Sequence, residues 1–134
     1  MTAVVRLETL ADLDEDETDR FRLSVSLRHE AVLDDGRRLL LLDDRGWSTS
    51  IGRSSSESIG SITSAEEIEE TARMVVGPDE PPEGVSAEAM AVDHWATLAE
   101  TLRRQGIDVE GSELRALPHM VVLSERLRMS VGGS

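Results

Sequence analysis

The sequence contains no cysteine, lysine, asparagine or tyrosine, and its only aromatic side chains are two tryptophans and one phenylalanine. The lack of cysteine excludes disulfides, thiolate metal sites and cysteine nucleophiles. The lack of lysine excludes Schiff-base and pyridoxal phosphate chemistry, as well as the lysine of a P-loop. With so few aromatic residues, the core of the protein has to be aliphatic.

Motifs for catalysis are scarce among the residues that remain. The sequence has no G-x-S-x-G nucleophile elbow, no H-E-x-x-H zinc motif and no G-x-G-x-x-G nucleotide loop. The three histidines, His29, His94 and His119, fall in three separate segments. We therefore predict no catalytic residues, no metal site and no cofactor, and an enzyme is less expected than a binding protein.

Acidic residues outnumber basic ones by 27 to 14, which gives a formal net charge of −13. Such a charge repels nucleic-acid phosphates and anionic lipids, so neither nucleic acid nor a membrane is an expected partner. It suits a more basic protein partner. No secretory signal pattern opens the sequence, and no apolar run approaches the roughly 20 residues that span a bilayer, so the expected location is cytoplasmic.

The length of 134 residues fits a single domain over 1–134. Its clearest element is 21–33, where apolar side chains occupy the odd positions, which is the period of a half-buried strand. Asp35 and Gly36 then precede a second apolar run, and an Asp-Gly pair at such a place predicts a two-residue type I′ turn. We therefore expect a β-hairpin over 21–43.

The turn sets the expected register of this hairpin, with Leu33 opposite Arg38 and His29 opposite Leu42 on the apolar face. The second strand, RLLLLDD, is apolar on both faces. We therefore expect it to be central in the sheet or covered by a partner, with a short strand at 4–7 as its neighbour.

Two helices are expected after the hairpin, at 65–76 and 87–105, and each begins after a capping serine. The second helix contains Asp93, His94 and Trp95 in a row, which looks like an active site. Adjacent residues of a helix point in different directions, so Asp93 cannot orient His94. We interpret Trp95 as core, His94 as boundary and Asp93 as solvent-facing.

The charged run 12–19 and the serine-rich run 48–63 are predicted to be mobile loops, and residues 130–134 are predicted to fray. A short edge strand at 59–62 is expected to close the second loop, whose serines at 53–58 could accept phosphate. The aspartates of 12–19 match three ligand positions of an EF-hand, but Glu17 stands where its glycine is required. The segment 119–129 fits either a helix or a strand.

The segments TARMVVGPDEPPEG, DHWATLAETLRRQGIDV and ALPHMVVLSERL resemble small acidic uncharacterised proteins of high-GC actinobacteria, over roughly residues 20–128. The resemblance implies an origin in such an organism, and it carries over no activity and no functional residue. The lack of lysine and asparagine, whose codons are AT-rich, agrees with a GC-rich coding sequence.

We predict an α+β domain, with a small antiparallel sheet built on the 21–43 hairpin and covered on one face by two to four helices. The predicted function is a non-catalytic acidic protein-binding module, of the inhibitor, immunity or regulatory adaptor type, that acts on a more basic protein. The residues expected to contact that partner are Asp12, Asp14, Glu15, Asp16, Glu17, Asp19 and Trp47.

Two alternatives stay open. A small-molecule or metal-dependent enzyme could use His29, His94 or His119 if the fold brought them together with an acid in one cleft. A structural subunit could form a homodimer or larger homo-oligomer through an uncovered face of the strand that carries Leu39 and Leu41.

Overall fold

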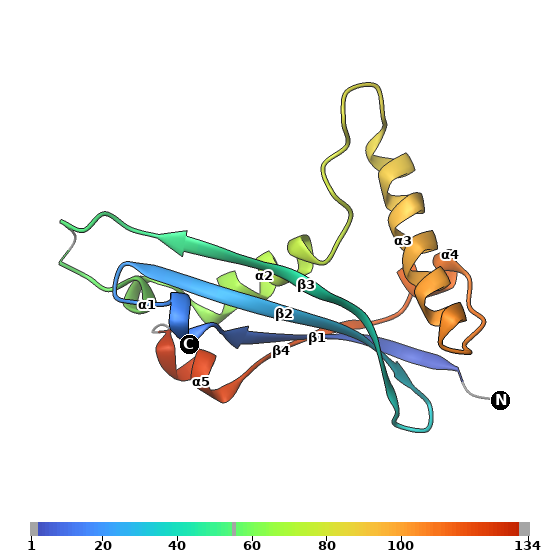
Figure 1. The fold of residues 1–134 in the computed structure, drawn as a ribbon, viewed down its shortest axis with the longest axis horizontal. Coiled ribbons are helices and arrows are strands. Elements are labelled where there is room, and N and C mark those ends of the chain that lie inside the picture. The colour runs from blue at the N-terminus through green and yellow to red at the C-terminus, as the bar shows by residue number, and fades with distance from the viewer. Residues whose placement is uncertain (1–2, 55, 132–134) are drawn as a thin grey trace.

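A computed structural model describes residues 3–54 and 56–131 and contains one four-stranded sheet flanked by helices (Figure 1). The strands, in the spatial order β3-β2-β1-β4, are β1 (Val4–Leu13), β2 (Arg22–Leu33), β3 (Arg38–Ser50) and β4 (His119–Leu123). The helices are the 3-10 helix η1 (Glu15–Glu17), α1 (Ile59–Ile62), α2 (Ala65–Val75), α3 (Ala87–Arg104), α4 (Gly111–Arg115) and α5 (Glu125–Ser130). The α+β class is confirmed.

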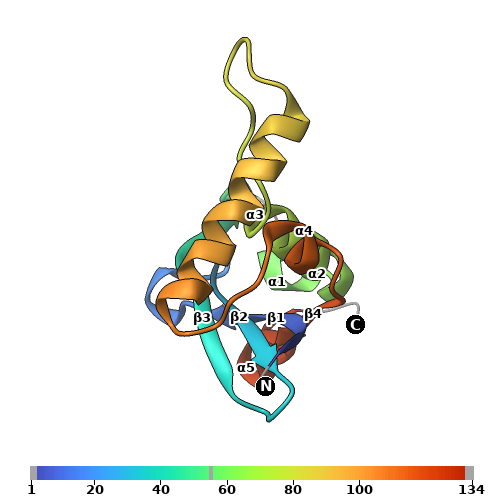
Figure 2. The same cartoon turned by 90° about the vertical axis from the view of Figure 1, so that its right-hand side faces the viewer.

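The sheet is antiparallel except at one edge. β1, β2 and β3 pair antiparallel, whereas β4 runs parallel to β1. Figure 2 shows α1 to α4 on one side of the sheet, and α5 packs at the end of β1. None of the helices among the described residues is both long and apolar enough to cross a membrane.

The predicted hairpin is confirmed, but its turn and register differ from the prediction. The N–H of Gly36 donates to the Leu33 carbonyl at 2.9 Å, and the N–H of Leu33 donates to the Arg37 carbonyl at 2.8 Å. The loop is therefore longer than two residues, and Arg38 lies opposite Val32 instead of Leu33. An irregularity further along the strands restores the predicted pairing of His29 with Leu42.

The prediction that β3 is central in the sheet is wrong, because β3 forms an edge. Among the described strands it pairs with β2, and the strand expected at 4–7 extends to residue 13 and lies between β2 and β4. Leu41 sits at the bulge and is buried, and Leu39 and Leu42 pack from the helix-facing side. Leu41 is thus covered within the chain and Leu39 partly so, while a partner on the second face of the strand and a homo-oligomer stay untested predictions.

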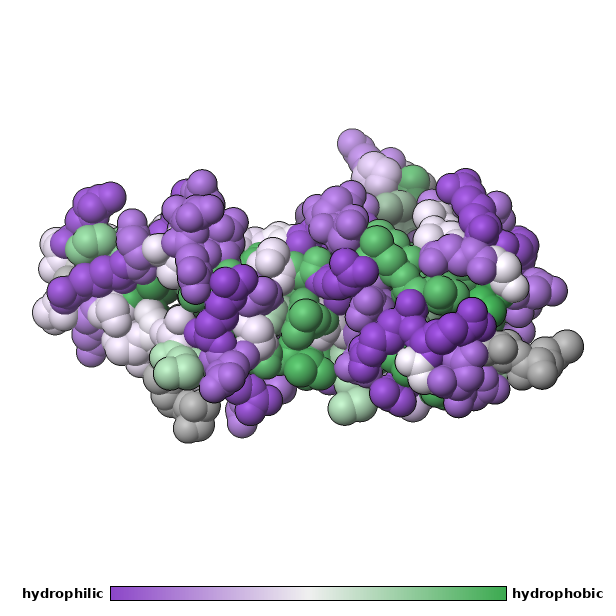
Figure 3. All heavy atoms as spheres, turned by 60° about the horizontal axis from the view of Figure 1, so that its bottom comes forward, coloured by the Kyte–Doolittle hydropathy of each residue, from purple (hydrophilic) through white to green (hydrophobic). Residues whose placement is uncertain are grey.

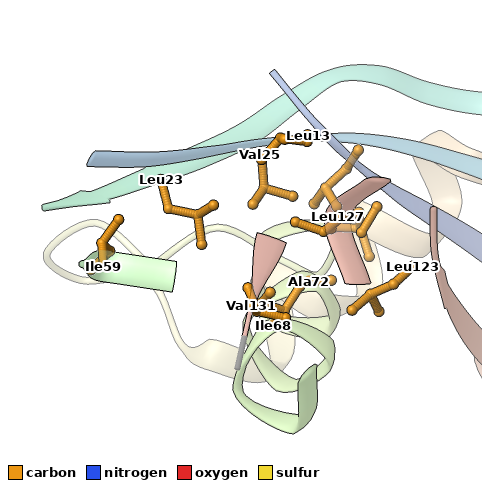
Figure 4. Close-up of a cluster of buried hydrophobic side chains, with 12 residues drawn as sticks. Leu13, Leu23, Val25, Ile59, Ile68, Ala72, Leu123, Leu127 and Val131 are labelled. Atoms are coloured by element: carbon orange, nitrogen blue, oxygen red, sulfur yellow. The ribbon is translucent and has the colours of Figure 1, made fainter. Parts of the chain in front are cut away.

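The core is aliphatic and is divided into two clusters along the sheet. Cluster 1 lies between the sheet and the helices α1, α2 and α5 (Figure 4). Cluster 2 lies between the sheet and the helices α3 and α4. The buried residues of cluster 1 are Ala11, Leu13, Leu23, Val25, Leu27, Ile59, Ile68, Ala72, Val76, Leu123, Leu127 and Val131. Those of cluster 2 are Leu7, Ala31, Leu33, Leu41, Leu98, Ala99, Leu102, Ile107, Val109 and Leu114.

The helix predictions at 65–76 and 87–105 are confirmed, including their caps. The hydroxyls of Ser64 and Ser86 accept the N–H groups of Glu67 and Ala89 at 3.2 and 3.1 Å. The first turns of α3 project away from the sheet (Figure 1), and only its second half packs deeply into cluster 2.

The packing of α3 determines how far each residue of the Asp93-His94-Trp95 stretch is exposed to solvent. Asp93 is exposed, as predicted, and His94 is half-buried. Trp95 is also only half-buried and packs against cluster 2 from its edge, so its assignment to the core holds in part. An added Cβ on Gly111 would meet the Trp95 carbonyl carbon at 2.9 Å, which shows how closely α4 approaches α3 here.

Several segments expected to be irregular contain regular structure. Residues 12–13 end β1 and 15–17 form η1, while 48–50 end β3 and 59–62 form a helix instead of the expected edge strand. The ambiguous segment 119–129 holds a strand and then a helix. Val131 is buried in cluster 1, whereas Ser55 of the serine run and residues 132–134 lie outside the described residues.

None of the described helices covers the centre of the other face of the sheet, and Figure 3 shows apolar side chains gathered there between hydrophilic ones. Leu10 and Met120 are 39% and 51% exposed. Beside them, the Arg38 guanidinium bridges Glu8 and Glu30 at 3.0 and 3.6 Å. These ion pairs connect three neighbouring strands on the open face.

Candidate functional site

The fold brings two of the three histidines together at one threonine. Oγ1 of Thr9 on β1 lies 2.8 Å from Nδ1 of His29 on β2 and 2.6 Å from Nε2 of His119 on β4. The two imidazole rings meet edge to face, with their centroids 5.1 Å apart. Thr9 and His29 are almost completely buried. We call these three residues the polar seam, because they cross the sheet between cluster 1 and cluster 2.

A hydroxyl has one hydrogen, so Thr9 donates to one ring nitrogen and accepts from the other. Burial lowers the pKa of His29 to about 3, with further lowering by His119, His94 and Arg45. The pKa of His119 is lowered by burial and by Arg73. Both imidazoles are therefore neutral near pH 7, and the seam is polar but uncharged.

His94 approaches the seam from α3. Burial, with Arg45 nearby, lowers its pKa, and its own charge would lower the pKa of His29. Nε2 of His94 is buried and has no hydrogen-bond partner among the described residues.

The enzyme hypothesis required two histidines and an acid in one cleft. Only the two histidines meet, because no carboxylate within the described part of the chain bonds either ring of the seam. Nor does that part contain a group of three or more histidine, aspartate or glutamate side chains placed to hold a metal ion. The contacts of the seam connect three strands, which is a structural role, and the enzyme hypothesis stays an untested prediction.

The acidic segment 12–19 uses much of its charge internally. The Asp12 carboxylate accepts hydrogen bonds from the Arg126 guanidinium at 2.7 and 2.8 Å and from the Ser124 hydroxyl at 2.6 Å. The Arg126 and Ser124 bonds hold the pKa of Asp12 well below its usual range. These bonds hold α5 against the end of β1, so the Asp12 carboxylate is already used to stabilise the fold.

Other acids of the segment 12–19 form longer ion pairs or bond the local backbone. Glu15 and Glu17 form ion pairs of 3.4 Å with Arg126 and Arg22, and the carboxylate of Asp19 accepts the backbone N–H groups of Phe21 and Arg22. Asp14 and Asp16 line a shallow hollow near Arg126. The carboxylates of Asp14 and Asp16 are therefore the most available to a partner, since neither forms an ion pair within the described chain.

Trp47, the remaining predicted contact, lies on β3 beside a larger hollow. The strand register sets Trp47 opposite Val25 and Val25 opposite Leu13, so Trp47 and the start of the acidic segment share one end of the sheet. Trp47 is half-buried against cluster 1. The hollow beside it has a volume of about 480 Å³ and is bounded by β3, α1 and α2.

A second hollow continues along the same strand towards its bulge. The two hollows together form what we call the edge groove. One wall is the continuous stretch 44–51 of β3 and the residue after it, and the other is the exposed side of α2. The α2 residues that line it are Glu67, Ile68, Thr71, Met74 and Val75.

Carboxylates dominate the charge of the edge groove. Four of them line it, from Asp44, Glu67, Asp79 and Glu80, against the single guanidinium of Arg45. That guanidinium donates to the carbonyls of Val75 and Gly77 at 2.8 and 2.9 Å and lies 3.8 Å from the Asp79 carboxylate. It is therefore already engaged by the end of α2.

The sequence predictions missed both Thr9 and the edge groove. In 4–13, Leu7, Thr9, Ala11 and Leu13 alternate with mostly polar residues, so reading this segment as a strand would have placed Thr9 on its buried face. The groove was missed because the serines of 48–50 suggested a loop, although Trp47, Thr49 and Ile51 continue the strand alternation.

No protein-family model, curated protein or solved structure matches the chain. The resemblance to actinobacterial proteins therefore stays a prediction.

Proposed function

We propose that this protein is a non-catalytic acidic binding module, of the inhibitor, immunity or regulatory adaptor type, that acts on a more basic protein. The observation that carries the proposal is the edge groove, where four carboxylates and one internally bonded guanidinium line two hollows next to Trp47. Complementary charge accelerates association and disfavours partners of the same sign. The net charge of −13 extends this preference over the whole surface.

The experiment is capture from a native lysate by the immobilised protein, at low and at high salt, with mass spectrometry of the eluate. One stoichiometric basic protein that is released at high salt is the expected result. A variant in which Asp44, Glu67, Asp79 and Glu80 become amides should lose it.

The matched control neutralises four exposed acids at the hairpin turn and around α4, outside the groove, so that the net charge changes equally: Asp34, Asp108, Glu110 and Glu113. This control should still capture the partner. Equal loss in both variants would show that only the overall charge matters, and an empty eluate in both buffers would overturn the proposal.

A separate experiment measures whether the acidic segment 12–19 affects the rate of association with the partner. Neutralising Asp14 and Asp16, while Asp12, Glu15 and Asp19 keep their internal bonds, should slow association and flatten its salt dependence if this segment faces the partner. An unchanged association rate would remove the segment from the interface.

A further inference from the structure

We propose that the edge of β3 receives an extended basic segment of the partner as a fifth strand of the sheet, with the apolar and basic side chains of one of its faces in the edge groove. The proposal rests on the proposed function and specifies how the partner is recognised. Strand addition of this kind takes its affinity from main-chain hydrogen bonds and its specificity from pockets for alternate side chains.

The backbone of β3 is open along 46–50. The N–H of Ile51 donates to the Phe21 carbonyl at 2.8 Å, and the pairing with β2 is regular from Ser50 back to Arg45. Backbone groups of alternate residues point to opposite sides of a strand, so those of Gly46, Ser48 and Ser50 point away from β2. Within the described chain, no hydrogen bond reaches these outward groups.

The other half of the same edge is partly covered. There the carbonyl of Leu40 accepts the side-chain amide of Gln105, at the end of α3, at 2.9 Å. Edge strands are commonly protected by such covers, because unpaired backbone groups are a template for another strand. The stretch 46–50, which lies beside the edge groove, has no such cover from any described residue.

The spacing of the groove suits an added strand. Side chains on one face of a strand recur every second residue, about 7 Å apart, and the two hollows follow one another along β3. Trp47, Ile51, Ile59 and Ile68 provide an apolar floor for the first hollow. At the second, the side chain of Met74 is 74% exposed and free to pack on a guest.

Charge selects a basic segment over a second copy of this chain. Pairing two β3 edges would bring two sets of groove carboxylates together, and like charges at close range disfavour association. Basic side chains on the groove-facing side of an added strand would instead meet Glu67 in the first hollow and Asp44, Asp79 and Glu80 in the second. Side chains of one face recur every second residue, so the expected occupant is an extended segment in which apolar and basic residues take turns at every second position.

The test uses a peptide of about eight residues in which arginine and valine take turns at every second position and serine fills the positions between them. It is titrated into the labelled protein and followed by amide chemical shifts. We expect shifts along 44–51 and 67–75, and no binding by the peptide with glutamate in place of arginine. Shifts confined to 12–19, no binding of the arginine peptide, or concentration-dependent dimerisation through β3 would each overturn the proposal.

Main-chain pairing is tested by two N-methylated isomers of the peptide, each methylated at alternate residues so that one edge cannot donate. One isomer should bind like the parent, and the other should bind about tenfold more weakly or worse. Equal affinity of both isomers would exclude strand addition. This test uses the unaltered protein, so it does not depend on whether a protein variant folds.

On the protein, Ser48→Pro removes one outward N–H without breaking a bond to β2, which edge strands tolerate, and Ser48→Ala is the control that keeps the N–H. Ser48→Pro should lose the peptide and Ser48→Ala should keep it. If Ser48→Pro still captures the basic partner from lysate in a salt-dependent way, strand addition fails while the proposed function stands.

Discussion

Nδ1 of His29 and the hydroxyl of Thr9 lie 2.8 Å apart, and both side chains are almost completely buried. Because the same hydroxyl also bonds His119, a single oxygen provides a partner for two ring nitrogens. Its removal leaves polar groups unpaired within the structure, and each such group costs about 1–3 kcal/mol.

Thr9→Val should therefore lower the free energy of unfolding by about 2–4 kcal/mol, measured by chemical denaturation. Thr9→Ser keeps the hydroxyl and should lose only about 1 kcal/mol, from the missing methyl group. Equal losses in the two variants would mean that packing of the methyl group, and not the hydroxyl, stabilises the seam.

The stability of the protein should fall as the pH drops from 7 to 5. The pKa of His29 is about 3 in the folded protein, against an ordinary value of 6.5. Below pH 6.5 the unfolded chain therefore takes up a proton that the folded protein refuses, so His29 alone should account for about 2 kcal/mol between pH 7 and 5. The lowered pKa values of His94 and His119 act in the same direction.

The titration of Glu8 and Asp12 does not contribute to the change in stability between pH 7 and 5. The pKa values of Glu8 and Asp12 are lowered from 4.5 and 3.8, so their contribution to stability is present above those values and is lost only at lower pH. Denaturation midpoints of a His29→Gln variant should vary less between pH 7 and 5 than those of the parent. An equally steep profile would exclude His29 as the source.

Breaking the bond between Asp12 and Arg126 should loosen α5. Arg126→Ala leaves the Asp12 carboxylate with the Ser124 hydroxyl, and because both ionic side chains are partly exposed we expect only a small loss of stability in chemical denaturation. Arg128→Ala on the same helix is the control, since Arg128 makes no ion pair with any described residue. Similar losses from both would show that the pair adds nothing beyond general charge.

Gly111 should not accept a side chain. An added Cβ would lie 2.9 Å from the Trp95 carbonyl carbon and 3.0 Å from the Ala96 nitrogen, both of them backbone atoms that cannot rotate away. Gly111→Ala should therefore destabilise the protein by about 1–3 kcal/mol, as judged by thermal or chemical unfolding. Gly52→Ala should change stability little, because an added Cβ there would come no closer to the described chain than 3.8 Å, to the Ser54 hydroxyl.

Local signals in the sequence predicted most elements, because they depend on neighbours in the chain. Alternation over 21–33 located β2, and the capping serines at 64 and 86 located α2 and α3. The edge position of β3 could not be predicted, since a bulge turns Leu41 and Leu42 towards the same core and makes the leucine run look apolar on both faces, as in a central strand.

The residues of the candidate sites are likewise divided into those that local sequence signals reveal and those that only tertiary contacts reveal. Trp47 and the acidic run are visible in the sequence, but the use of Asp12 to hold α5 depends on Arg126, which lies far away in the chain. The meeting of Thr9, His29 and His119 likewise requires three strands to pair in one order. Contacts of this kind arise only from tertiary structure.

The division of the core has a consequence for local unfolding. β1 and β2 pass through both clusters, whereas α3 and α4 belong to one cluster and α1, α2 and α5 to the other. Either group of helices can detach while the other keeps its apolar cover, so the chain should open as two cooperative units joined by a common pair of strands. Native-state hydrogen exchange should then show the amides of α3 and α4 exchanging through one opening and those of α2 and α5 through another, with β1 and β2 the last to exchange.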